Sequence, residues 1–169
     1  MANKTHLDAL IDYKEDVIAT LTQDQQLMGL IFDDPEIDLE SDEIFNIRDT
    51  HIFDHSYVDD VVQTDSVLIL VESGLIGMTS KEINTLELQI QVIVARHFMK
   101  LNTKKFKGLR GNRRDNVIRR IELLLHDARP GIGRMLLVDC GPVDVPKGFT
   151  SMRMTFLIND FRNNRTLQA

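Results

Sequence analysis

Residues 86–95 carry the most regular pattern in the chain, an alternation with the two-residue period of a β-strand. The apolar positions are Leu86, Leu88, Ile90, Val92 and Val94. A strand with one continuous apolar face has to bury that face against a second layer of structure. The intervening positions begin polar at Glu87 and end apolar at Ile93 and Ala95, which indicates that a partner covers the far end of the outward face.

Three shorter segments also predict strands, and their order along the chain points to one class of fold. They span residues 67–71, 135–138 and 152–158. Gly74 and Gly77 are predicted to open a loop after the first of them. Because the strands follow one another in adjacent pairs, we expect an α+β fold: an antiparallel sheet of about four strands with helices packed on one face. A doubly wound parallel sheet is excluded, because it would need a helix between each pair of strands and the predicted order has too few helices.

Helices are predicted before and between these strands. Apolar residues at helical spacing predict a helix over 5–22. Asp24 is placed to cap a short second helix, which ends before Pro35. A third helix runs from its N-cap Asn112 to about residue 127 and carries an apolar stripe that includes Ile121. We expect one domain over residues 1–169, a length that can bury a core without disulfides.

Charge is divided unevenly along the chain. Residues 1–82 hold 4 basic and 19 acidic residues, a balance of −15, whereas residues 83–169 hold 16 and 7, a balance of +9. The basic residues concentrate at 96–120, which contains 10 of them and one acid. One interpretation is an electrically polar molecule that meets copies of itself or touches a polyanion with one face. The other is that both halves are solvated surface of one compact fold.

Residues 33–66 form the least periodic part of the chain and contain 12 acids. Apolar and aromatic residues are scattered through this segment, and a pure linker would lack them. We therefore expect an irregular acidic arm that docks on another surface, with Phe53, Tyr57 and Val58 as its docking residues. Residues 163–169 are expected to form a frayed C-terminal tail.

No motif of a catalytic, cofactor or metal site stands out in the sequence. Cys140 is the one cysteine, which excludes an intrachain disulfide, and its place after an apolar strand predicts a small buried hydrophobe. His51 and His55 have the spacing of two metal ligands, but the irregular segment around them favours a surface or interface pair. The longest apolar run has five residues, too few to cross a bilayer. We expect a protein that is made in the cytoplasm, is not an enzyme, and uses no cofactor, metal or membrane.

Residues 100–111 form a basic loop, punctuated by glycines, that leads into the N-terminus of a helix. Loop N–H donors, the helix dipole and arginines together favour an anion. The candidate contact residues are Lys104, Lys105, Lys107, Arg110, Arg113 and Arg114. They are expected to face another subunit or DNA, and only Phe98 and Phe106 are near enough in sequence to stack on bases.

The order of these segments is similar to that of a family of phage proteins. An N-terminal helix precedes an arm with Phe53-Asp54-His55-Ser56-Tyr57-Val58, and the long strand ends at Arg96-His97-Phe98-Met99. A helix then opens with Arg113-Arg114-Asp115-Asn116-Val117-Ile118, and the last strand ends in Phe156-Leu157-Ile158-Asn159-Asp160-Phe161. Over roughly residues 5–162 the chain resembles the small tail-terminator and head–tail joining proteins of long-tailed bacteriophages.

This resemblance implies a virion protein of the tail and neck, made in the host cytoplasm. Its subunits would close into a ring, commonly a hexamer, that caps the tail tube. The implied partners are further copies of the chain, the tail tube protein and the head connector protein, with non-specific contact to the genomic DNA that passes through. Two other classes stay open: a nucleic-acid-binding accessory protein that uses residues 96–120, and an enzyme with a site assembled from the acidic arm and the histidines.

Overall fold

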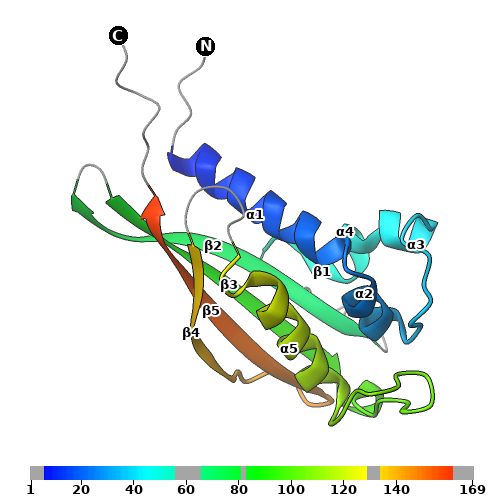
Figure 1. The fold of residues 1–169 in the computed structure, drawn as a ribbon. Coiled ribbons are helices and arrows are strands. Elements are labelled where there is room, and N and C mark those ends of the chain that lie inside the picture. The colour runs from blue at the N-terminus through cyan, green and yellow to red at the C-terminus, as the bar shows by residue number, and fades with distance from the viewer. Residues whose placement is uncertain (1–5, 56–65, 81–82, 129–133, 162–169) are drawn as a thin grey trace.

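The computed structural model describes residues 6–55, 66–80, 83–128 and 134–161, and its centre is a five-stranded sheet (Figure 1). The strands span Ile52–Phe53 (β1), Val67–Ser80 (β2), Ile83–Ala95 (β3), Arg134–Pro142 (β4) and Phe149–Phe161 (β5). Their spatial order is β1-β2-β3-β5-β4, and all neighbours are antiparallel except β1 and β2. The predicted α+β class is confirmed. The sheet has one strand more than expected because two residues of the acidic arm join it in parallel.

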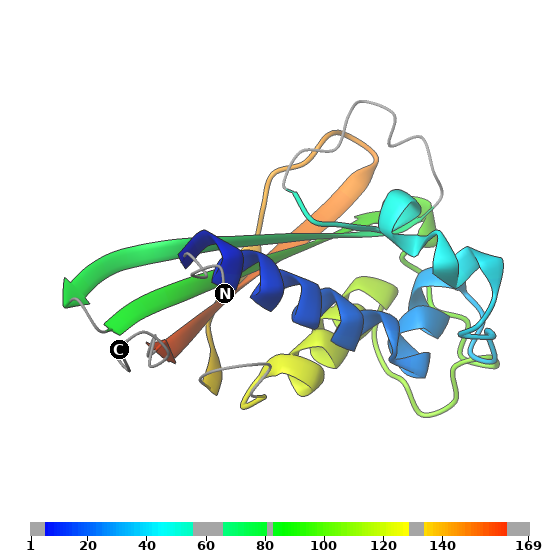
Figure 2. The same cartoon turned by 90° about the horizontal axis from the view of Figure 1, so that it is seen from above.

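The three long helices lie on one face of the sheet, as expected (Figure 2). They are α1 (His6–Thr22), α2 (Gln25–Phe32) and α5 (Arg113–Leu125), and shorter turns form α3 (Asp42–Phe45), α4 (Ile47–Thr50) and the 3₁₀ helix η1 (Arg96–Phe98). Both predicted N-caps are confirmed. The Asp24 carboxylate accepts a hydrogen bond from Leu27 N–H (2.8 Å), and the Asn112 side chain accepts one from Asp115 N–H (2.9 Å). Of the helices within the described residues, none is both long and apolar enough to cross a bilayer.

One hydrophobic core fills the space between the sheet and the helices. The inward positions of β3, from Leu86 to Val94, are fully buried. Val17 of α1, Leu30 of α2 and Ile121 of α5 cover them from the helical side and are themselves fully buried. The outward positions 87, 89 and 91 are half-buried. The alternation of residues 86–95 therefore has the orientation that the sequence predicts.

The hairpin of β2 and β3 corrects one prediction. Gly74 and Gly77 lie within β2 and do not open a loop, since pairing with β3 continues through Gly74↔Glu87 to Ser80↔Ile83. Cross-strand pairing satisfies the backbone here and outweighs the low strand preference of glycine. The hairpin extends past the first turn of α1 in both views (Figures 1 and 2).

The first part of the acidic arm folds onto its own chain. Its apolar residues Ile37, Ile44, Ile47 and Ile52 are at most 9% exposed and belong to the central core. Burial of apolar surface within the chain favours this arrangement, so these side chains are not available to dock on a neighbour. The part of the arm at 56–65 and the expected tail at 163–169 lie outside the described residues.

Gly29 lies inside α2, where glycine disfavours a helix, because the chain returns closely over this helix. A Cβ atom on Gly29 would lie 2.9 Å from both Asp34 O and Pro35 Cα. The Gln25 amide fastens the same turn by donating hydrogen bonds to Ile37 O (2.7 Å) and Pro35 O (3.3 Å). The close approach therefore needs a residue without a side chain at position 29.

The strand β4 forms one edge of the sheet, and part of its outer backbone is already bonded. Met135 exchanges two hydrogen bonds with the backbone of residues 127–128 (2.9 and 3.0 Å), and Leu137 N–H donates to Nδ1 of His126 (3.2 Å). The pairing with β5 shifts register after Leu137, and the strand ends at Pro142. These features leave little regular edge for another strand.

Cys140 is exposed, so the expectation of a buried side chain is wrong. It lies on this edge strand opposite Met154 of β5, and an edge residue is covered on fewer sides than a central one. Partial desolvation, together with the carboxylates of Asp139 and Glu122, raises the pKa of its thiol. A raised pKa disfavours the reactive thiolate.

Ile121→Asp is expected to cost about 4 kcal/mol or more of stability, because it places an unpaired charge at a position with 0% exposure. Leu123→Asp on the same helix is the matched control. Leu123 is 65% exposed, so its replacement should leave the melting temperature nearly unchanged. Circular dichroism melts compare the two variants, and equal melting temperatures would contradict the assigned helix face.

Gly29→Ala is expected to destabilise the protein by about 1–3 kcal/mol, although alanine favours a helix interior by about 1 kcal/mol over glycine. The reason is the backbone of residues 34–35, which the new methyl group would meet. Gly74→Ala is the control, because a Cβ atom there has nothing within 4 Å. Urea unfolding midpoints measure the difference. A stabilised Gly29→Ala would show that the turn moves aside at no cost.

Candidate interaction site

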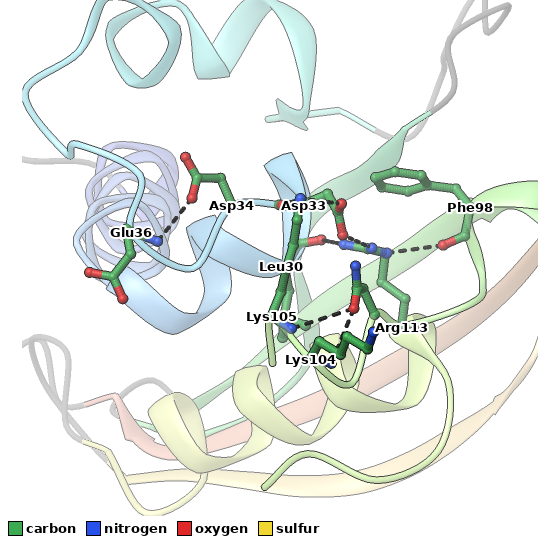
Figure 3. A network of polar contacts seen from close by, with 9 residues as sticks. Leu30, Asp33, Asp34, Glu36, Phe98, Lys104, Lys105 and Arg113 are labelled. Carbon is green, nitrogen blue, oxygen red and sulfur yellow. Dashed lines mark hydrogen bonds and ion pairs between the residues drawn. The ribbon is translucent and has the colours of Figure 1, made fainter. Parts of the chain in front are cut away.

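A buried arginine joins separate parts of the chain at one end of the sheet (Figure 3). Arg113 is 1% exposed. Its guanidinium donates to Leu30 O in the last turn of α2 (2.6 Å), to Phe98 O (2.9 Å) and to the Asp33 carboxylate. It also lies 4.0 Å from the ring centroid of Phe98 and 5.7 Å from that of Phe106. The cation is thus supplied with acceptors and aromatic faces inside the chain.

Local sequence places the partners of this arginine. Asp33 is the C-cap of α2 and has a left-handed backbone (φ 58°), which aspartate adopts more readily than most residues. The C-terminal end of a helix carries partial negative charge and favours a cation. Lys105 reaches the same point from the basic loop and donates to Asp33 O (2.9 Å) and to its carboxylate (3.0 Å).

A second ion pair holds the other end of α2. Arg120 donates to both carboxylate oxygens of the N-cap Asp24, at 2.9 and 2.6 Å. Each end of α2 is therefore fastened to α5, and we call the pairs Asp24–Arg120 and Asp33–Arg113 the α2–α5 clamp. Arg113 and Arg120 lie seven residues apart, which puts them on one face of α5.

The clamp controls the ionisation of its carboxylates. Desolvation by itself would raise the pKa of Asp33, but hydrogen bonds from Arg113 and Lys105 outweigh it and hold the pKa below 3.8, its ordinary value. At Asp24 desolvation likewise favours a raised pKa, but hydrogen bonds from Arg120 and Leu27 N–H outweigh it and lower the pKa. The hydrogen bonds that Arg120 donates to Asp24 in turn raise the pKa of the guanidinium. Asp24, Asp33 and Arg120 are therefore charged at neutral pH.

The six cations predicted to make contacts divide into two groups. Arg113 is wrong as a contact residue, because the clamp buries it. Arg114 is half-buried and donates to Thr150 Oγ1 (2.5 Å) and to the Asp115 carboxylate, and Lys105 is exposed but paired with Asp33. The remaining three are exposed and stay candidates: Lys104, Lys107 and Arg110.

Asp33 and Arg120 do not stand out in the sequence as site residues. The available signal is spacing: an aspartate at each end of a short apolar segment, and two arginines seven residues apart on a later helix. Periodicity identifies the residues that share one face of a helix, but it does not identify the element that packs against that face.

The other candidate residues lie apart from the clamp or serve it. Phe98 and Phe106 pack against Arg113 and do not form a platform for bases. Phe53 is half-buried in β1, with its ring centroid 5.6 Å from that of His55, and Tyr57 and Val58 lie outside the described residues. The His51 ring packs on Phe32, with 4.6 Å between the two ring centroids. Across the residues that the structure describes, no three His, Cys, Asp or Glu side chains gather as a metal-binding group.

The segment around α3 and the loop between η1 and α5 lie at the same end of the molecule as α2 (Figures 1 and 2). The acidic strip consists of six exposed residues: Asp34, Glu36, Asp38, Glu40, Asp42 and Glu43. The basic loop presents five: Lys100, Lys104, Lys105, Lys107 and Arg110. The Asp33–Lys105 ion pair joins the two segments. Opposite charges therefore lie side by side here, although they are far apart in the sequence.

A pocket of about 480 Å³ lies between the acidic strip and the basic loop, and we call it the α2 pocket. Its apolar lining is Pro35, Phe106 and Leu109. Its charged lining consists of Glu36, Lys105, Lys107 and the clamp pair Asp24–Arg120. Within the described residues nothing pairs with Lys107.

Asp33→Asn is expected to cost about 3 kcal/mol at neutral pH, because buried Arg113 loses its charged partner. Folding lowers the pKa of Asp33, so its contribution is present above the unfolded pKa and is lost as the pH falls through the folded one. The variant should therefore lose less stability than the wild type between about pH 5 and about pH 2. Urea unfolding at a series of pH values measures this. Parallel pH profiles would contradict the role of the carboxylate.

Comparison with known proteins places this chain among phage proteins. A family model described as YomW matches residues 13–158, which include the clamp, the α2 pocket and most of the sheet. No curated protein matches the chain significantly. The name YomW is that of a Bacillus phage SPBeta-like protein, and it indicates a phage-associated protein. With most of its length matched, the chain belongs to the YomW family.

Proposed function

We propose that the chain is a structural virion protein that forms a ring at the head-proximal end of a phage tail. The ring would end the tail tube and join it to the head connector, and the genome would pass through its centre. The phage-derived family name supports the phage setting. The resemblance in segment order supports the tail-terminator role. This role is structural and needs neither a catalytic group nor a cofactor.

The observation that carries the proposal is the β2–β3 hairpin. Its paired strands extend past the start of α1, beyond the part of the sheet that the helices cover (Figures 1 and 2). On the way out, Leu75 and Ile76 are 38% and 46% exposed on opposite faces of β2. Apolar side chains on a projecting hairpin favour contact with another protein surface. A subunit of a ring needs such an extension toward its neighbours.

The alternative is a nucleic-acid-binding accessory protein that uses residues 96–120, and the structure gives it less support. Arg113 is buried in the clamp, while Lys105 and Arg120 are paired with carboxylates. Contacts to the phosphate backbone are the main source of affinity for DNA. The acidic strip beside the basic loop repels that backbone. A surface with both signs of charge instead favours a protein partner with the complementary arrangement.

A phage that lacks this gene is expected to produce filled heads and free tails that do not join. Addition of the purified protein to the lysate should restore joined particles, and the unfolded variant Ile121→Asp should not. Electron micrographs and plaque counts measure both effects. Joined, infectious particles without the protein would overturn the proposal. Normal joining together with steeply salt-dependent DNA binding by the protein would favour the alternative.

A further inference from the structure

An exposed phenylalanine projects from the acidic strip. Phe45 is 86% exposed, more than any other large apolar side chain that the structure describes. Its neighbour Ile44 is buried in the core, and Phe45 N–H donates to Ser41 O (3.1 Å). The backbone of this turn is therefore held in place, and Phe45 follows Asp42 and Glu43 on its exposed side. An exposed aromatic residue on a charged surface has the properties of an interface anchor.

The α2 pocket has the complementary properties. Its apolar lining comes from Pro35, Phe106 and Leu109. Lys107 also lines the pocket, is exposed, and has no partner within the described residues. The residues that line it do not include Phe45, so the chain does not fill its own pocket with this side chain. An aromatic ring fits this apolar lining. The acids beside the ring are attracted because the three basic residues of the lining, Lys105, Lys107 and Arg120, outnumber its two acids, Asp24 and Glu36.

We propose that Phe45 of one subunit inserts into the α2 pocket of a second copy of the chain, with Asp42 and Glu43 against Lys107. This inference rests on the proposed ring and names its subunit contact. Anchor and pocket occupy different places on the chain, so each subunit gives its anchor to one neighbour and its pocket to the other. Such a heterologous contact closes into a ring when the rotation between subunits closes. A mutual exchange between two copies would stop at a dimer.

Replacing Phe45 by p-benzoylphenylalanine, a photoreactive aromatic residue, tests the contact directly. Irradiation of the concentrated purified protein should give a ladder of covalent oligomers whose cross-linked peptide maps to residues 105–109. The same photoreactive residue at position 123 is the control, since Leu123 is also exposed (65%) but lies outside the proposed contact. A dimer without higher oligomers would overturn the heterologous arrangement. Cross-links that map elsewhere, or none, would overturn the contact.

Reversing the charges tests the electrostatic part of the contact. Glu43→Lys and Lys107→Glu are each expected to weaken self-association about tenfold. The chain that carries both changes should recover most of the loss, because the opposite charges meet again. Sedimentation at several protein concentrations measures association, and melting temperatures confirm that each variant is folded. Failure of the double variant to recover would overturn the assignment of Lys107 as the partner of Glu43.

Cross-linking in phage particles distinguishes a wrong contact from a wrong proposed function. Particles that contain the photoreactive chain at the neck, but show no cross-link to residues 105–109, would overturn the contact and leave the proposed ring standing. Particles that lack the chain would overturn the proposed function. In that case the cross-linking of the purified protein still decides the contact.

Discussion

Two ion pairs at the ends of one short helix set the arrangement of the helical layer. The helix α2 has eight residues, too few to be stable alone, so its position depends on what holds it. Arg113 and Arg120 fasten its two ends to α5, and Arg113 also binds the carbonyl oxygens of Leu30 and Phe98. A buried guanidinium is costly unless it is fully paired. Because its acceptors come from α2 and from the loop after β3, these elements have to assemble together.

Patterns that are local in the sequence predict much of this fold. Two-residue and helical periodicities locate β3 and the three long helices, and side-chain chemistry locates both N-caps. Apart from Cys140, which is exposed because it lies on an edge strand, the failures involve partners that are distant in the sequence. The sequence around Arg113 is typical of an exposed basic surface, but its carboxylate partner Asp33 lies 80 residues away along the chain. Arg120 pairs with Asp24 across 96 residues. In the same way, β2 continues through two glycines because β3 pairs with it, and the first part of the acidic arm finds its apolar partners in its own core.

The candidate site shows that charges far apart in the sequence can be neighbours in the folded chain. The sequence separates acids from bases, whereas the structure brings the acidic strip and the basic loop together beside the α2 pocket. Cations with internal partners form the framework. Lys107, which has no partner among the residues that the structure describes, is available for intermolecular contact. Sequence spacing identifies the basic segment as a whole but cannot divide it in this way, because the division depends on Asp24 and Asp33.

The protected edge of the sheet has a consequence for how copies of this chain can combine. Residues 126–128 occupy part of the β4 backbone, and a register shift follows Leu137. At this edge, growth by adding strands, the route to open-ended polymers, is therefore hindered. A second copy that approaches β4 meets little free backbone ladder, so a contact there is fixed by the shapes and charges of side chains.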